Sequence, residues 1–309
     1  MHFFNLMSMK LFTNKLGASD LEHGEFNGPS AKLVILQRPS QSGDRVALQS
    51  AWKGKLGLQA LALKSELGFV RYAQVHAVGL GHPLVFLIRL TRSRPVAFLV
   101  SLTAPEKGYK TGVKSTSILA LEERWCVIHE FWWPSVDAMF TATTSQRGLD
   151  ALSRLRELLA SHSGFTAVLL CRERIVAAPR KESSNTARTG FFLRLRSQDI
   201  PVQMQNYWEE NHAPLVQSLT EKLNFDQYDR APAIIDDSRT NEVIHALGGE
   251  QALPYLGIAS LSYPTIKDLI LGFFRPKSQF ANFKLMQDEL AFIDPPACPP
   301  FLGTRFPIG

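Results

Sequence analysis

A histidine within an amphipathic helix is the first candidate for chemistry in this 309-residue chain. One face of the helix predicted over 199–223 carries residues at intervals of four, three, four and four: Trp208, His212, Leu215, Leu219 and Leu223. An imidazole is rarely buried among apolar neighbours without a partner, and burial favours its neutral, proton-accepting form. His212 is therefore a candidate general base. The alternative is a core histidine whose ring bonds a backbone carbonyl.

Tyr228 lies on the strand predicted to follow, over 225–235, and offers a phenolic donor to a developing enolate oxygen. Together with His212 it would suffice for enolisation followed by aldol closure or loss of water. The alternative for Tyr228 is cross-strand packing, because strands favour tyrosine. Tyr72, which has no histidine at the matching place, favours that alternative.

Further residues are candidates for substrate binding. Arg194 lies on the strand face of Phe192 and could hold a carboxylate or an enolate, although a surface-facing arginine is the simpler interpretation. His129 and Trp133 share one face of a predicted strand over 124–133, as residues of an aromatic-lined pocket would. Core packing explains that pair equally well. Trp208 and Tyr72 complete the set.

The chain contains an internal repeat. Two sets of aromatic residues have the same mutual spacing and a constant offset: Trp52, Phe69 and Tyr72, and Trp208, Phe225 and Tyr228. Each set follows a strand-like run, so two copies of one supersecondary unit are predicted. Leu56 stands where the second copy has His212. A site that depends on this histidine therefore exists once.

The predicted elements give each copy the order β-α-β-β-α-β, the ferredoxin-like arrangement. The fold class is therefore α+β, with two such repeats pairing their sheets within one chain as a homodimer of single copies would. The predicted divisions are an N-terminal extension over 1–30, a first repeat over 31–176 with an insertion at about 79–121, a linker over 177–188, and a second repeat over 189–309. The proline-rich tail is expected to form only a short edge strand over 301–308.

Composition excludes several classes of protein. The net charge of +6 comes from dispersed Lys and Arg, so no nucleic-acid partner is expected. Cys126, Cys171 and Cys298 are odd in number and far apart, which argues against disulfides and a zinc site and suits the reducing cytosol. No run of about 18 apolar residues is present, so no membrane span is expected. Neither a dinucleotide fingerprint nor a P-loop occurs, and neither a metal nor a cofactor is predicted.

The run Trp208-Glu-Glu-Asn-His-Ala-Pro-Leu-Val216 resembles the W-x-x-x-H-x-P-L motif of EthD-type proteins, which are dimeric α+β barrels. The segments 131–136 and 263–266 resemble that family's third strand and second helix. The first half departs from the motif at Leu56. The resemblance implies a barrel superfamily of cofactor-free cyclases, dehydratases, decarboxylases, isomerases and monooxygenases, together with members that have no demonstrated catalysis. The tandem form resembles proteins encoded near fungal natural-product pathways.

These observations predict a cytoplasmic, cofactor-independent cyclase, dehydratase or isomerase, or a pericyclase if the shape of the pocket alone is sufficient. Its substrate would be an apolar, polyketide- or terpenoid-like intermediate of secondary metabolism. His212 would move protons and Tyr228 would polarise an oxygen. One rival is a cofactor-free monooxygenase on the same fold, and the other is a non-catalytic binding protein. Internal duplication predicts a monomer, because each half already has its partner.

Overall fold

The structure is a computed structural model that describes residues 30–39, 45–78, 88, 96, 125–161, 163–177, 186–196, 199–248, 250–251 and 255–309. The predicted extension (1–30, apart from Ser30) and the predicted insertion (79–121, apart from Ile88 and Val96) lie outside the described residues. Most of the predicted linker also lies outside them.

Each half contributes four strands to the sheet in the ferredoxin-like order. Those of the first half are β1 (Ala31–Pro39), β2 (Arg71–Ala77), β3 (Val127–Trp133) and β4 (Ser163–Arg172). Those of the second half are β6 (Thr186–Arg194), β7 (Gln227–Pro232), β9 (Tyr255–Tyr263) and β10 (Pro300–Pro307). The spatial order β4-β1-β3-β2 in one half matches β10-β6-β9-β7 in the other. The predicted duplication of one β-α-β-β-α-β unit is therefore confirmed.

The helices follow the same repeat. Those of the first half are α1 (Arg45–Lys53), α2 (Lys55–Ala62), α3 (Lys64–Leu67), α6 (Val136–Thr144) and α7 (Gln146–Ala160). Those of the second half are α8 (Pro201–Tyr207), the π-helical segment η2 (Trp208–His212), α9 (Ala213–Ser218), α10 (Thr220–Leu223), α11 (Arg239–Ala246), α12 (Ile266–Phe274), α13 (Pro276–Glu289) and the 3₁₀ turn η3 (Pro295–Ala297). No helix among the described residues is long and apolar enough to cross a membrane.

Equivalent residues end and begin the helices of the two halves. Gly68 ends α3 and Asn224 ends α10, both in the left-handed conformation, with φ of 66° and 58°. Glycine and asparagine are the residues that adopt this conformation most readily. Ser135 and Thr265 cap α6 and α12 by accepting a hydrogen bond from the backbone N–H three residues on. The local chemistry of the repeat thus specifies where its helices stop and start.

The two four-stranded sheets join into one sheet that nearly closes into a barrel. On one side β10 pairs antiparallel with both β6 and β2. On the other side β5 (Arg174–Ala177), which follows β4 after Glu173, pairs with β7. The expectation that the tail supplies only a short edge strand is therefore wrong. Pro300 and Pro307 occupy the two ends of β10. Proline lacks a backbone N–H, but at these positions the loss affects only the ends, so the interior of the strand can pair on both sides.

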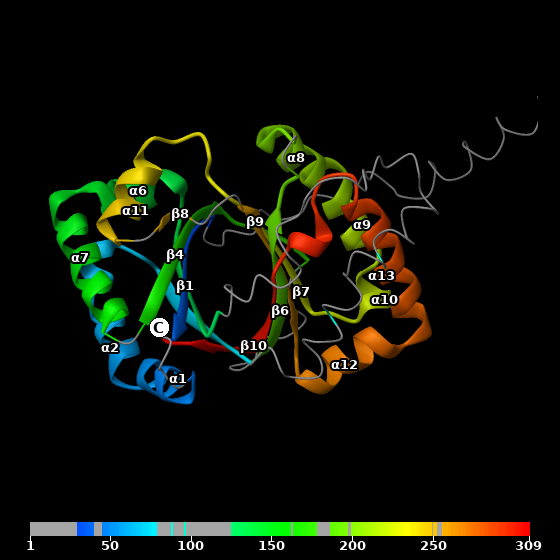
Figure 1. Cartoon of the computed structure of the whole chain (residues 1–309), viewed down its shortest axis with the longest axis horizontal. Coiled ribbons are helices and arrows are strands. Elements are labelled where there is room, and N and C mark those ends of the chain that lie inside the picture. Colours follow the sequence, from blue (N-terminus) through cyan, green and yellow to red (C-terminus); the bar gives the residue numbers. More distant parts are fainter. Residues whose placement is uncertain are drawn as a thin grey trace, which may run out of the picture.

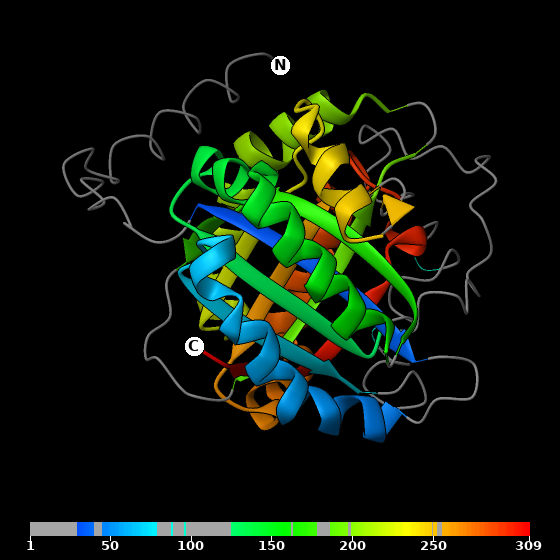
Figure 2. The same ribbon diagram turned by 90° about the vertical axis from the view of Figure 1, so that its left-hand side faces the viewer.

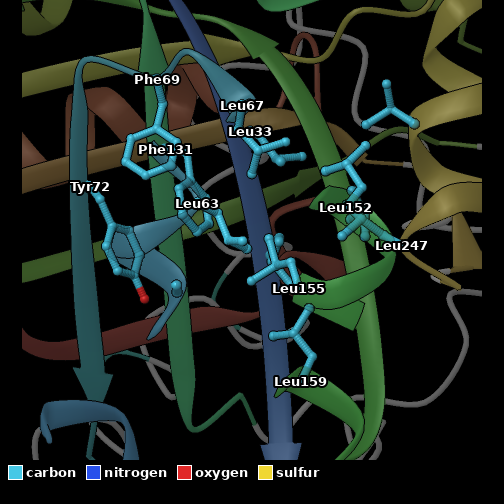
Figure 3. Packing of buried hydrophobic residues seen from close by; sticks show 14 of the residues in the cluster. Leu33, Leu63, Leu67, Phe69, Tyr72, Phe131, Leu152, Leu155, Leu159 and Leu247 are labelled. Atoms are coloured by element: carbon cyan, nitrogen blue, oxygen red, sulfur yellow. The ribbon is translucent and has the colours of Figure 1, made fainter. Parts of the chain in front are cut away.

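The helices form an outer layer on each side of the sheet (Figure 1). In the view onto the first half, α1, α2 and α7 cross over the strands that they cover (Figure 2). Residues on the helix-facing side of β1 and β3 pack with these helices in one apolar core, which includes Leu33, Phe131 and Leu155 (Figure 3). The opposite faces of the strands point into the barrel. Because successive side chains of a strand alternate between the two faces, every second residue packs on the helices and the others lie in the barrel interior.

The barrel interior is apolar at one end and ionic at the other. The apolar part includes Val34, Ile128 and Phe192. The ionic part is a cluster of charged residues from both halves, called here the interior ionic cluster: the buried Lys32, Glu130, Glu173, Arg188 and Asp229 and the partly buried Arg305. Charges buried away from water are tolerated when they are paired, and each member of this cluster lies within ion-pair distance of an opposite charge.

The connections between the second and third strands of both halves contribute described residues that lie against the opposite half. In the second half this connection carries α11, which packs on α6 and α7 of the first half (Figure 1), and β8 (Glu250–Gln251), which pairs in parallel with β4. In the first half it carries Ile88 and Val96, and Val96 packs against Leu290 of the second half. Each half is thus partly covered by the other.

Candidate functional site

A cavity of about 350 Å³ lies between the sheet and the helices of the second half. Its apolar wall includes Val216, Leu261, Phe273, Phe283, Leu285 and Met286. Its polar lining includes His212, Tyr228, Gln279, Asn282 and Glu289. Ile88 and Val96 also line it, so both halves contribute to one site. A largely apolar cavity with a few convergent polar groups is the usual form of a small-molecule site.

His212 is held by a carboxylate. Its Nδ1 atom lies 2.9 Å from Oδ2 of Asp288, and Oδ1 of Asp288 accepts a hydrogen bond of 2.8 Å from the Tyr207 hydroxyl. An ionised carboxylate can only accept, so Nδ1 carries the proton and Nε2 has its lone pair free to accept one. The Phe292 ring, 5.0 Å away between centroids, packs against the imidazole. This fixed tautomer is what a general base requires.

The helix that carries His212 is irregular where the histidine lies. Trp208–His212 is π-helical, and the N–H of Ala213 bonds the carbonyl of Trp208, five residues back. Pro214 follows and has no N–H to donate to the carbonyl of Glu210, which removes the α-helical bond at this position. The predicted helix over 199–223 therefore exists as four segments. Of the predicted apolar stripe, Trp208, His212, Leu219 and Leu223 are buried and Leu215 is partly buried. Short π-helical segments frequently occur at functional sites.

Tyr228 is positioned as a hydrogen-bond donor. Its hydroxyl oxygen accepts a 2.9 Å hydrogen bond from Nε1 of Trp208, which leaves the hydroxyl proton to donate to another group. Burial raises the pKa of Tyr228, and the Glu289 carboxylate raises it further, while Trp208 and Arg230 act in the opposite direction. The phenol is therefore protonated over the physiological range and suited to donate to a substrate oxygen.

Two acidic residues of the site, Asp288 and Glu289, were not predicted from the sequence. Both are buried on α13, at relative exposures of 7%. Alignment of α12 with α6 places Leu158 and Leu159 of the first half at their positions. Asp288 and Glu289 thus stand at the end of α13, where the equivalent helix of the first half, α7, has leucines. Extending the repeat comparison to this helix would have found them.

The corresponding space in the first half is filled. The Trp52 and His129 rings lie 4.2 Å apart between centroids, and Phe131 stacks on Tyr72 at 4.4 Å. The second half has the smaller Ala259 and Leu261 at the positions of His129 and Phe131. Both of these smaller residues line the cavity. The cavity therefore exists in the second half because small side chains replace aromatic ones.

His129 belongs to a buried hydrogen-bond chain in the first half. Its Nε2 atom donates to Oε1 of Gln37 at 2.9 Å, and its Nδ1 atom accepts from the Tyr72 hydroxyl at 3.0 Å. Nε2 of Gln74 donates to the Tyr72 oxygen, and Oε1 of Gln74 accepts from His76. Burial lowers the pKa of His129 to about 3 and that of His76 to about 4. Both rings are therefore neutral near pH 7.

The predicted site residues fall into separate places. His212 and Tyr228 line the cavity, and Trp208 donates a hydrogen bond to the Tyr228 hydroxyl. Tyr72 and His129 lie in the hydrogen-bond chain of the first half, and Trp133 packs in the same core, where its Nε1 donates to the carbonyl of Leu67 at 2.7 Å. Arg194 lies near the barrel interior, with its guanidinium carbon 5.1 Å from the centroid of the Tyr255 ring. The substrate-binding roles of these four residues and of Trp208 stay predictions, as do the catalytic roles of His212 and Tyr228.

The strand order and the nearly closed sheet define the fold as that of the dimeric α+β barrel proteins, with both subunits supplied by one chain. Residues 201–296, in the second half of the chain, match the family model of the EthD domain. The matched range includes His212, Tyr228, Asp288 and Glu289. It excludes the first half.

Solved structures share the fold at very low sequence identity. One is an anthrone oxidase-like protein, with 8% identity, a TM-score of 0.50, and coverage of 91% of this chain and 94% of its own. Another is a proposed monooxygenase from Lactobacillus acidophilus, with 6% identity, a TM-score of 0.42 and the same coverage of both chains. No curated protein is significantly similar in sequence. Among the residues that the structure describes, no three His, Cys, Asp or Glu side chains gather in a way that could hold a metal ion.

Proposed function

We propose that this protein is an enzyme that moves protons on an apolar intermediate of secondary metabolism, as a cofactor-independent cyclase, dehydratase or isomerase. The observation that carries this proposal is His212, held by Asp288, on the wall of an apolar cavity that Tyr228 also lines. A base with a fixed tautomer and a phenolic donor facing one enclosed space are the two groups that enolisation needs.

The proposed reaction begins at a C–H bond next to a carbonyl group of the substrate. Nε2 of His212 would take the proton, and the charge that develops on the carbonyl oxygen would be stabilised by the Tyr228 hydroxyl. In one course the electron pair adds to a second carbonyl carbon of the substrate, whose C=O π bond opens and whose oxygen takes the proton held by His212. In a second course it expels hydroxide from the neighbouring carbon. In the second case the proton held by His212 leaves with the hydroxide as water. The apolar wall strengthens both interactions by excluding solvent.

Deletion of the gene in its source organism, followed by restoration of wild type or of His212→Gln, tests this proposal. We expect an uncyclised or hydrated precursor to accumulate in the deletion strain and to be cleared only by wild type. Clearance by His212→Gln as well would contradict the proton-transfer role and leave a pocket that works by shape, as in a pericyclase. An unchanged metabolite profile in the deletion strain would favour a non-catalytic binding protein.

A cofactor-free monooxygenase is the second candidate, supported by the fold shared with the anthrone oxidase-like protein. The first step would be the same removal of a proton by His212. The resulting carbanion would react with O₂, and a CH₂ group would become a carbonyl group with release of one water. Oxygen uptake during turnover, with one atom of ¹⁸O₂ in the product, would identify this reaction. Turnover without oxygen uptake would exclude it.

A further inference from the structure

Exposed aromatic side chains gather where α12 meets α13, on the outer side of the second half (Figure 1). Phe274, Phe280 and Phe283 are 51%, 57% and 37% exposed. Phe280 and Phe283 lie three residues apart on α13 and therefore on neighbouring positions of its surface, and Phe274 ends α12. One large apolar side chain exposed alone is ordinary, but several together usually mark an interaction site.

The first half has polar residues on the equivalent surface. The alignment of α12 with α6 continues along α13 and α7, and it places Thr144, Asp150 and Ser153 at the positions of the three phenylalanines. The same pair of helices thus folds with polar residues at these places, so the packing of the repeat does not require aromatic ones. The aromatic surface is a property of the second half, which also has the cavity.

This surface is also basic. Over positions 269–287 the sequence has three cations, Arg275, Lys277 and Lys284, and neither Asp nor Glu. Nζ of Lys284 lies 5.0 Å from the centroid of the Phe280 ring, so positive charge and aromatic surface coincide. The neighbouring α10 carries one acidic and one basic residue and leaves this balance unchanged.

The cavity opens at the same place. Phe274 and Phe283 line the cavity, and both are exposed to solvent at the same time. They therefore stand at its mouth, and a ligand that enters there passes their rings. We call the basic and aromatic residues around this mouth the aromatic corner: Phe274, Arg275, Lys277, Phe280, Phe283 and Lys284.

We propose that the aromatic corner binds the surface of an anionic lipid bilayer and turns the mouth of the cavity toward it. The phenylalanine rings would enter the boundary between head groups and acyl chains, and the cations would pair with the charged head groups. Apolar area and positive charge are the two contributions on which such binding depends. An apolar ligand dissolved in the bilayer would then reach the cavity without crossing water. The contact goes beyond the proposed function, because it requires no turnover.

Flotation of the full chain with lipid vesicles tests this proposal. We expect wild type to bind vesicles made of equal parts of phosphatidylcholine and phosphatidylserine, and to bind pure phosphatidylcholine at least about ten-fold more weakly. Phe280 lies outside the cavity lining, and Phe280→Ser should weaken binding to the mixed vesicles about ten-fold. Lys277→Gln combined with Lys284→Gln should weaken it about five-fold for each cation, and added salt should weaken it in wild type.

Control variants in the first half separate this contact from general adsorption of a basic protein. Leu58→Ser removes an apolar side chain that is 64% exposed, and Arg147→Gln removes the cation equivalent to Lys277. Both variants should bind the vesicles as wild type does. His212→Gln should lose turnover but keep vesicle binding, so failure of the proposed reaction and failure of this contact are distinguishable.

A fluorescent label reports which surface meets the lipid. The three cysteines of the chain are buried, so a label on Phe280→Cys reports that position. Its emission should shift to shorter wavelength on mixed vesicles, whereas a label on Leu58→Cys should not respond. Absence of binding by wild type would overturn the proposal and leave the aromatic corner to a second copy of the chain or a protein partner. Equal binding by wild type, Phe280→Ser and the lysine double variant would also overturn it.

Discussion

At the scale of single residues, Asp288 determines which nitrogen of His212 is available. The carboxylate accepts the Nδ1 proton, so Nε2 has a free lone pair. An asparagine amide can instead donate to Nδ1, which would move the proton to Nε2 and turn the base into a donor. The geometry of the site would be almost unchanged. Asp288 is therefore a positioning residue, because it acts on the substrate through His212.

For Asp288→Asn we expect kcat to fall by about 10²- to 10⁴-fold, the usual contribution of a general base, while KM changes little. Asp288 lies outside the cavity lining, so ligand binding should persist. Turnover of the accumulated precursor gives the rates, and ¹⁵N NMR of the histidine ring gives the tautomer. Asp236→Asn, at an exposed carboxylate, serves as the control. An unchanged tautomer would show that Asp288 does not position the ring.

His129 predicts how stability depends on pH. Its pKa is about 3 in the folded protein because of burial, with a smaller effect from His76, and about 6.5 when unfolded. Between these values the unfolded chain binds more protons, so stability is lost as the pH falls through this window. From pH 6.5 to 5, His129 should reduce the free energy of unfolding by about 2 kcal/mol.

Urea unfolding at several pH values measures this dependence. His129→Gln should make the curve flatter over this window, even though the variant is less stable at every pH because Tyr72 and Gln37 lose their partner. His245→Gln changes an exposed histidine and should keep the slope of wild type. A slope that is equal in His129→Gln and wild type would contradict the assignment.

At the scale of elements, both halves interrupt the same helix at the same place. In the first half the break lies at Gly54, between α1 and α2, and in the second half η2 covers the equivalent position. The carbonyl freed by the break at Trp52 accepts from Nε2 of Gln74, and the carbonyl of Trp208 accepts from Ala213. The irregularity therefore belongs to the repeat, and the second half uses it to place His212.

Gly57 shows how tightly this region of the first half is packed. A Cβ atom at this position would lie 2.4 Å from the carbonyl oxygen of Trp52 and 2.9 Å from Nε2 of Gln74. Gly57→Ala should therefore destabilise the protein by about 1–3 kcal/mol, although alanine favours helices. Thermal unfolding measures the effect. Gln59→Ala, at an exposed position of α2, should change stability by less than about 0.5 kcal/mol. Equal stability of Gly57→Ala and wild type would show that the helix relaxes.

At the scale of the whole molecule, the interior ionic cluster ties the two halves together. Arg188 of β6 bonds Glu130 of β3 and Ser260 of β9 and pairs with Asp229 of β7. Burial alone would raise the pKa of Glu130, but Arg188 and Lys32 outweigh it and hold that pKa below its ordinary value. The carboxylates of the cluster thus depend on cations from the other half as well as from their own.

Arg188→Met should cost about 3–5 kcal/mol, because it leaves buried carboxylates under-compensated. The measurement is the free energy of unfolding in urea. Arg172→Met breaks an exposed pair with Asp236 and should cost less than about 1 kcal/mol. If Arg188→Met were as stable as Arg172→Met, the cluster would contribute little to holding the halves together.

The barrel also predicts the state of association. In the homodimeric arrangement, strand pairs such as β10 with β2 and β5 with β7 would form between subunits, and here they form within one chain. We therefore expect a monomer, and sedimentation equilibrium measures it. A dimer that persists at micromolar concentration would contradict this expectation and would point to a further interface.

The sequence by itself determined the repeat, the order of its elements and the place of His212. These follow from local patterns: residue spacing identifies the buried helix face, and constant offsets identify the two copies. Comparison of the two copies also marks the acidic residues of α13, because Asp288 and Glu289 stand where the first half has leucines. What it could not provide is which distant side chains meet.

Only the tertiary structure brought Asp288 to His212, across 76 positions of the chain, and placed Glu289 in the same cavity. It also decided that β10 joins the two halves, since a proline-rich tail alone suggests an edge strand. The hydrogen-bond chain of His129 and the wall contributed by Ile88 have the same origin. Contacts of this kind depend on how two sheets close and which side chains fill the space between layers, and no local spacing records that geometry.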